Sequence, residues 1–179
     1  MDWRERLQAA ETEDDFNAVK DDIISHSHYT LELITSPCVL RAYLRSREWE
    51  EDYFQGAFYM VSGASRRVDL MRVLVPEFIT LEDLTHDKEK TSTFYGLVAA
   101  TAREGRVDVM SFFLNEMGVK PEFGVDLDFT KPLLTVACYW GKVDIIDLLF
   151  EKGADANVQM SCGTVPAYDA MWNPDVNVL

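Results

Sequence analysis

Basic residues are scarce in this 179-residue chain, which has 17 Lys and Arg against 31 Asp and Glu and a formal net charge of −14. Nucleic-acid-binding proteins neutralise phosphates with basic side chains, so the charge argues against a nucleic-acid partner. Anionic membrane surfaces should repel the chain for the same reason. The simplest role of the charge is to keep the molecule soluble and monomeric, while a basic or neutral protein remains an acceptable partner.

Cysteine is scarce as well. Cys38, Cys138 and Cys162 are odd in number, widely spaced and without a C-x-x-C pair, which excludes a disulfide framework and gives no zinc-ligand spacing. A reducing compartment, the cytoplasm or the nucleus, is therefore expected. The first residues lack the apolar core of a secretory signal, and no apolar run approaches the roughly 20 residues of a membrane span.

Motifs of the common catalytic sites are missing too, since G-x-S-x-G, a Walker-type glycine loop and H-E-x-x-H do not occur. His26 and His28 form an H-x-H pair, but the nearby acids do not complete a set of three or four metal ligands. Asp126 and Asp128 stand two apart in a predicted loop, where they add charge and do not form a catalytic pair. No catalytic residue, metal or cofactor is predicted.

The chain does contain a repeat. "RVDLMRVL" at residues 67–74 recurs as "RVDVMSFF" at 106–113 and as "KVDIIDLL" at 142–149. The valines of the three copies are 39 and 36 residues apart, inside the window typical of stacked structural repeats. Each copy predicts an amphipathic helix with an Asp in its first turn, where the helix dipole favours an anion.

A helix rich in small residues precedes two of the copies, as "GLVAATAREG" at 96–105 and "PLLTVACYWG" at 132–141. Gly105 and Gly141 are placed to end these helices in the left-handed conformation. The copy that follows then runs antiparallel, and Gly153 ends the last one. The predicted unit is a helix-turn-helix hairpin, with Cys138 as a small buried side chain.

Residues 132–157 resemble an ankyrin repeat, whose pattern is T-P-L-H-x-A-A-x-x-G, then a V-V-x-L-L helix, then G-A-D-x-N. The resemblance covers residues 53–179 more weakly, and it departs from the pattern at the histidine, where Thr135 stands. A further repeat begins with Gly163, Pro166 and Ala170 and stops inside its second helix at residue 179. Either the chain is a fragment of a longer protein or something else caps that end.

Residues 1–52 carry no ankyrin signature but predict helices. Thr12 and Asp15 can form a capping box, and Ser36-Pro37 is an N-cap and first-turn pair. We expect this segment to be an N-terminal helical cap or a degenerate repeat. The resemblance implies an all-α fold for the whole chain: an ankyrin-repeat solenoid of about four stacked helix-turn-helix units, the last incomplete, with projecting hairpin loops.

The resemblance also implies a non-catalytic protein-protein interaction module, such as an adaptor, inhibitor or scaffold, that binds a protein through its concave face and loops. The family's contact positions fall on Arg103, Glu104, Asp126, Asp128, Phe129, Lys131, Tyr139, Trp140, Gln159, Met160, Trp172 and Asn173. Trp and Tyr suit such contacts because they supply large rigid areas. The alternative for Trp140 and Trp172 is that they pack against each other.

Three further points stay open. The repeat intervals exceed the ankyrin period of about 33 residues, so the acidic stretch 76–92 is expected to be an inserted loop that either steers a basic partner or is simply solvated. An enzyme built on the stack would need a deep pocket beside Tyr139 and Trp140 with a buried carboxylate. The chain would alternatively be the recognition fragment of a multidomain protein.

Overall fold

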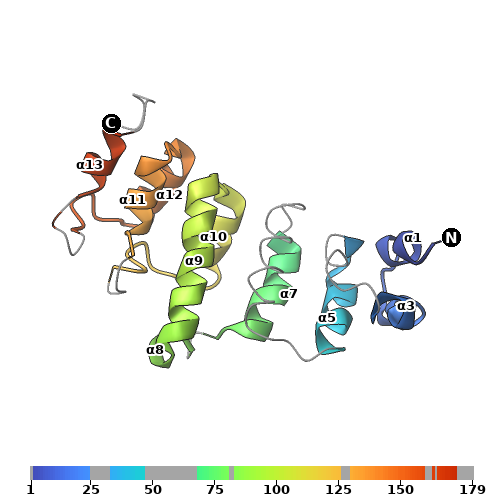
Figure 1. The fold of residues 1–179 in the computed structure, drawn as a ribbon. Helices are drawn as coiled ribbons and strands as arrows, with labels where there is room; N and C mark the ends of the chain where they lie inside the picture. The colour runs from blue at the N-terminus through green and yellow to red at the C-terminus, as the bar shows by residue number, and fades with distance from the viewer. Residues whose placement is uncertain are drawn as a thin grey trace. The chain divides into compact units, whose positions relative to one another are not determined.

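The computed structural model describes residues 2–24, 33–46, 68–80, 83–125, 130–159, 163 and 165–172 (Figure 1). Within these ranges all regular secondary structure is helical and no strand occurs, which confirms the all-α class. The chain divides into two compact units, Met1–Thr80 and Leu81–Leu179. The predicted boundary between residues 52 and 53 lies outside the described residues.

Five helices are described in the first unit. They are α1 (Trp3–Gln8), α2 (Glu13–Asn17), α3 (Lys20–Ile24), α5 (Pro37–Arg45) and α7 (Val68–Phe78). Helix α2 packs on α1, α3 and α5, and α5 packs on α7. Phe16 and Tyr43 meet edge to face in the core between α2 and α5, with their ring centroids 6.2 Å apart. Aromatic pairs prefer this geometry.

The predicted capping box of α2 is confirmed. The Asp15 N–H donates to the Thr12 hydroxyl at 3.2 Å, and the Asp15 carboxylate accepts from the Thr12 hydroxyl at 2.7 Å and from the Thr12 N–H at 3.0 Å. The bond from the Thr12 side chain is the main reason that the pKa of Asp15 is lowered from 3.8, because it stabilises the charged carboxylate.

Ser36 and Pro37 occupy the N-cap and first turn of α5, as predicted. The Ser36 hydroxyl does not cap its own helix, however. It donates to the Glu11 carbonyl at 2.9 Å and so joins the start of α5 to the connection between α1 and α2.

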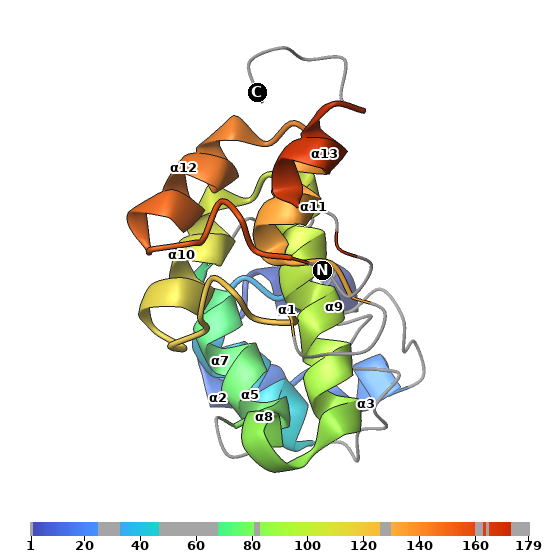
Figure 2. The same ribbon diagram turned by 90° about the vertical axis from the view of Figure 1, so that its left-hand side faces the viewer.

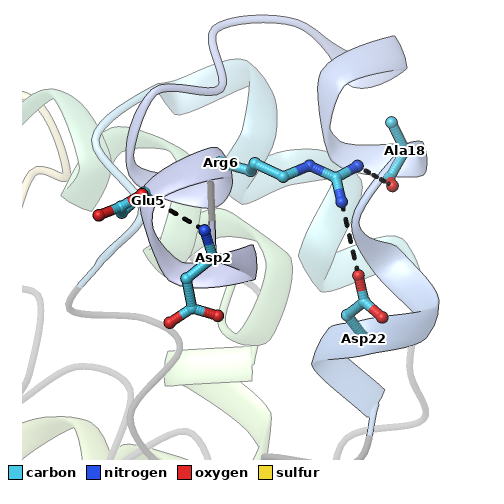
Figure 3. Close-up of polar contacts among 5 residues, drawn as sticks. All are labelled: Asp2, Glu5, Arg6, Ala18 and Asp22. Atoms are coloured by element: carbon cyan, nitrogen blue, oxygen red, sulfur yellow. Dashed lines mark hydrogen bonds and ion pairs between the residues drawn. The ribbon is translucent and has the colours of Figure 1, made fainter.

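Arg6 joins the first three helices, as Figure 3 shows. Its guanidinium donates to the Ala18 carbonyl at 2.6 Å and lies 3.7 Å from the Asp22 carboxylate. At the start of α1 the Glu5 carboxylate accepts from the Asp2 N–H at 3.3 Å. The ion pair is exposed and adds little stability, so the bond to the carbonyl carries most of this link.

Six helices are described in the second unit. They are α8 (Asp83–His86), α9 (Lys88–Glu104), α10 (Val107–Asn115), α11 (Leu133–Tyr139), α12 (Val143–Glu151) and α13 (Pro166–Ala170). The α9–α10 and α11–α12 hairpins stack, with α11 on α9 and α12 on α10, and α13 packs on α11 (Figures 1 and 2). Helices α9, α11 and α13 thus form one layer, and α10 and α12 form a second.

Glycines end these helices where the sequence predicts. Gly105 caps α9 with φ 74°, Gly141 follows the end of α11 with φ 65°, and Gly153 follows the end of α12 with φ 88°. The left-handed conformation lets the chain reverse at once into the antiparallel partner. Asp108 and Asp144 stand in the first turns of α10 and α12, also as predicted.

The prediction of an acidic loop at 76–92 is wrong for its described part. Helix α7 continues through Pro76 to its end, α8 follows, and α9 starts at Lys88, ahead of the predicted start at Gly96. Helix α9 starts early because Asp87 caps it: the Asp87 carboxylate accepts from the Glu89 N–H at 3.0 Å and from the Lys90 N–H at 3.1 Å. This acid is a helix cap, which ties up its charge in local bonds.

Two core residues bear on the predicted repeat. Cys138 is buried, as expected of a side chain at a small-residue position. Thr135, which stands where the ankyrin pattern has histidine, is fully buried, and its hydroxyl has no hydrogen-bond partner among the described residues. A buried hydroxyl left without a partner is unfavourable, so Thr135 lowers the stability of α11, the helix in which it lies.

Candidate functional site

Exposed aromatic side chains gather at the C-terminal ends of α11 and α13. The exposed fractions are 43% for Tyr139, 49% for Trp140, 50% for Tyr168 and 69% for Trp172. Figure 1 shows α9, α11 and α13 in one layer with these ends on the same side. We call the exposed side chains there the helix-end surface, made of Arg103, Glu104, Tyr139, Trp140, Tyr168, Met171 and Trp172.

Each tryptophan of this surface has a tyrosine neighbour from its own helix end. Tyr139 and Trp140 meet edge to face with ring centroids 5.5 Å apart, and Tyr168 and Trp172 do so at 6.5 Å. These are the ring contacts of the two indoles among the described residues, and a contact between Trp140 and Trp172, the alternative that the sequence leaves open, is not one of them. Both indoles keep about half or more of their surface exposed.

The turns behind the surface lie against each other. A Cβ placed on Gly105 would come within 3.1 Å of Lys142 Cδ, so the Lys142 stem crosses the turn between α9 and α10. This contact brings the end of α9, with Arg103 and Glu104, close to the end of α11. The Glu104 carboxylate lies 3.6 Å from Arg103 and 3.8 Å from Arg106, which balances the charge at this edge.

Lys131, a predicted contact residue, connects all three helices of the layer. Its Nζ lies 2.9 Å from Asp169 Oδ1 on α13 and 5.0 Å from the ring centroid of Tyr139 on α11. The Tyr95 hydroxyl of α9 donates to the Lys131 carbonyl. Burial raises the pKa of Tyr95 to about 12, so the hydroxyl stays protonated and remains a donor at neutral pH.

Asp169 is the functional candidate that sequence reasoning missed. Its side chain is only 9% exposed, and its Oδ2 atom is buried without a hydrogen-bond partner among the described residues. No motif or spacing marks it, and an acid is usually on the surface. Its importance comes from Lys131, which is 38 residues away in the sequence.

A pocket of about 210 Å³ lies between α11, α12 and α13. Its lining residues are Leu134, Cys138, Ile146, Phe150, Ala156, Pro166, Ala167 and Ala170. Burial first, and then the charge of Asp169, raises the pKa of the Cys138 thiol to about 11. The enzyme alternative required a cavity beside Trp140 with a carboxylate in it, whereas this lining contains neither Trp140 nor an acid.

Among the remaining predicted contact residues, the structure describes Gln159. Gln159 is exposed in the segment after α12, and no contact given for it reaches the helix ends. Asp126, Asp128, Phe129, Met160 and Asn173 lie outside the described residues, as do His26, His28 and Cys162.

The described ranges lack both a metal-binding cluster and a membrane-spanning helix. They contain no group of three or more His, Cys, Asp or Glu side chains that could hold a metal ion. None of the helices described is both long enough and apolar enough to cross a bilayer.

Comparisons with protein-family models, with curated proteins and with solved structures found no match. The function proposed below therefore rests on the chain's own residues.

Proposed function

We propose that this protein is a non-catalytic interaction module that binds a protein partner through the helix-end surface. The observation that carries the proposal is the exposure of Trp140 and Trp172, each beside a tyrosine, at the ends of adjacent helices. Large aromatic side chains left in water are unfavourable for an isolated molecule, and they are the residues that dominate binding energy at interfaces.

The positions of these side chains are set before any partner binds. Lys142 packs across one turn, and Lys131 links Tyr139 to Asp169. A surface held in this way loses little conformational entropy on binding, so more of the contact energy appears as affinity. This favours an adaptor, inhibitor or scaffold role over a surface that orders only on contact.

The ankyrin-like architecture is part of the proposal. The stacked hairpins α9–α10 and α11–α12, with α13 beside α11, support a solenoid of repeated helix pairs in the second unit. Such stacks use the ends of their first helices and the adjoining loops as binding surface. The chain would act as a monomer in the cytoplasm or nucleus, with a neutral or basic partner that its net charge of −14 does not repel.

Site-specific photo-crosslinking tests the proposal. A benzophenone amino acid replaces Trp140 or Trp172, and a matched variant carries it at Asp14, an exposed position on α2 in the first unit. After irradiation in extract of the source cells, we expect one protein to be captured from the first two positions and not from the third.

The captured protein is then purified and its affinity measured by calorimetry. Trp140→Ala should weaken binding by about 2 kcal/mol or more, as at a central interface residue. Equal capture from Asp14, or an unchanged affinity of the double variant Trp140→Ala with Trp172→Ala, would remove the helix-end surface from the binding site.

A further inference from the structure

We propose that the groove between α12 and α13 is a second docking surface, which receives an amphipathic helix with basic residues from a partner protein. No residue of the helix-end surface lines this groove. The inference therefore goes beyond the proposed function and rests on different side chains.

The groove lies on the side of α12 where the next helix of a continued stack would pack. Helix α12 packs against α10 within its layer, and the described residues place no further helix of that layer beyond it. On that side Ile146 and Phe150 line the pocket, opposite the small side chain of Ala167 on α13. Phe150 is 46% exposed. A helix would fit here because helices already pack on α12 in this manner.

The pocket has room for an anchoring side chain. An apolar protein cavity of about 150 Å³ accommodates benzene, so a pocket of about 210 Å³ can take the ring of a Phe or the branch of a Leu. Residues four apart on a helix lie on the same face. Two apolar residues at this spacing would cover the Ile146 and Phe150 side chains together.

The rim of the pocket is acidic. Asp147 follows Ile146, Glu151 follows Phe150, and Asp155 precedes Ala156, so each acid is next in sequence to a lining residue. All three are exposed, and none forms an ion pair among the described residues. Asp147 and Glu151 are exposed and four residues apart, so they form a stripe on α12 next to that of Ile146 and Phe150.

Few basic side chains offset this charge. Lys152 is the one basic residue from 143 to 159, against four acids in the same stretch. Lys or Arg side chains that flank the apolar anchors would therefore meet unneutralised carboxylates, which increases the rate of association and selects the orientation of the helix.

Synthetic peptides of about 16 residues test the proposal, since shorter ones form little helix. The probe carries Phe and Leu four residues apart with flanking Lys. One control replaces the Lys by Glu, and a second replaces Phe and Leu by Ala. By fluorescence anisotropy we expect the probe to bind the full chain at least about tenfold more tightly than either control, and more weakly as salt screens the rim.

Variants of the protein locate the binding. Ala167→Trp fills the pocket from an exposed position, and Asp147→Lys with Glu151→Lys reverses the rim; each should lower probe affinity about tenfold or more. The matched control, Asp14→Lys with Asp21→Lys, makes the same change in net charge at exposed sites of the first unit. It should change the affinity by less than about twofold.

Four results would overturn the proposal. The first is that the Glu peptide binds as tightly as the probe, and the second is that Ala167→Trp binds the probe as tightly as the unchanged protein does. The third is that the control charge reversal at Asp14 and Asp21 lowers the affinity as much as the reversal at the rim. The fourth is that something other than a partner helix occupies the groove. Sedimentation detects a second copy as a dimer that Ala167→Trp dissociates. Removal of residues 174–179 detects competition by the chain's own end as a rise in probe affinity of about tenfold or more.

Discussion

Gly124 lies at a point where both the backbone and a neighbouring ring require a residue without a Cβ. Its φ is +95°, and a Cβ there would overlap the ring of Tyr95. The same ring carries the hydroxyl that donates to the Lys131 carbonyl. A substitution at Gly124 therefore disturbs the turn at Gly124 and also, through Tyr95, the hydrogen bond to Lys131 ahead of α11.

We expect Gly124→Ala to lower the free energy of unfolding by about 2–4 kcal/mol, from left-handed strain together with steric overlap. Urea denaturation measures the loss. Gly118→Ala is the matched control, because Gly118 also has positive φ, +68°, but nothing within 4 Å of its Cβ position. It should cost only about 1 kcal/mol. Equal losses in the two variants would mean that Tyr95 moves aside freely.

Thr12 and Asp15 give a prediction that involves pH. Thr12→Val removes the hydroxyl that chiefly lowers the pKa of Asp15, so that pKa should rise toward 3.8 in a carboxyl NMR titration. Because the folded pKa is lowered, the stabilisation is present above pH 3.8 and is lost as the pH falls through the lower folded value. Thr12→Ser keeps the hydroxyl and should leave the pKa low; a low value in the valine variant would assign the effect to the backbone bonds.

Helix α13 depends on contacts outside itself. It has five residues, too few for a stable isolated helix. Its packing on α11 and the bond from Lys131 to Asp169 hold it in place. Since Tyr168 belongs to α13 and Trp172 follows it, this ion pair also positions half of the aromatic part of the helix-end surface.

Lys131→Met should therefore loosen α13 selectively. The variant leaves the buried Asp169 carboxylate without its cation, at a cost of about 1–3 kcal/mol. We expect faster hydrogen exchange of the Met171 and Trp172 amides, with no change for amides in the middle of α10.

The double variant Lys131→Met with Asp169→Asn is the control, because a neutral amide is less costly to bury than an unpaired carboxylate. It should exchange more slowly than Lys131→Met at α13. If the two variants exchange alike, the charge of Asp169 does not hold the helix.

The sequence predicts the helical elements best where a local signal exists. Gly105 and Gly141 end their helices by backbone conformation, and the Thr12 box needs only neighbouring residues. The acidic charge around Asp87 favours a loop in the sequence, whereas in the structure its carboxylate caps α9. The role of Asp169 could not be predicted, since it depends on Lys131 in a distant segment and on burial by tertiary packing.

For the molecule as a whole, charge should control association. The chain has a net charge of −14 at neutral pH and a pI of about 4.5. Repulsion then keeps the exposed aromatic side chains of different molecules apart, and it vanishes near the pI. We expect light scattering to show a monomer at about pH 7.5 and larger species near pH 4.5. A constant mass across this range would show that charge is not what prevents self-association.

The candidate site was partly predictable at this scale. Tyr139 and Trp140 directly precede the turn glycine Gly141, a position that can be read from the sequence, and both side chains are exposed. Tyr168 and Met171 were missed, since only the packing of α13 on α11 decides which of its faces is left outside.

The two described thiols, Cys38 and Cys138, should react with alkylating reagents at very different rates. Cys38 is exposed, whereas Cys138 is buried and burial raises its pKa to about 11, so the Cys138 thiol is almost entirely protonated at neutral pH. Alkylating reagents attack the thiolate and must also reach it. Cys38 will thus be alkylated first, and the slower alkylation of Cys138 will report how readily a reagent enters the groove that Cys138 lines and meets its thiolate.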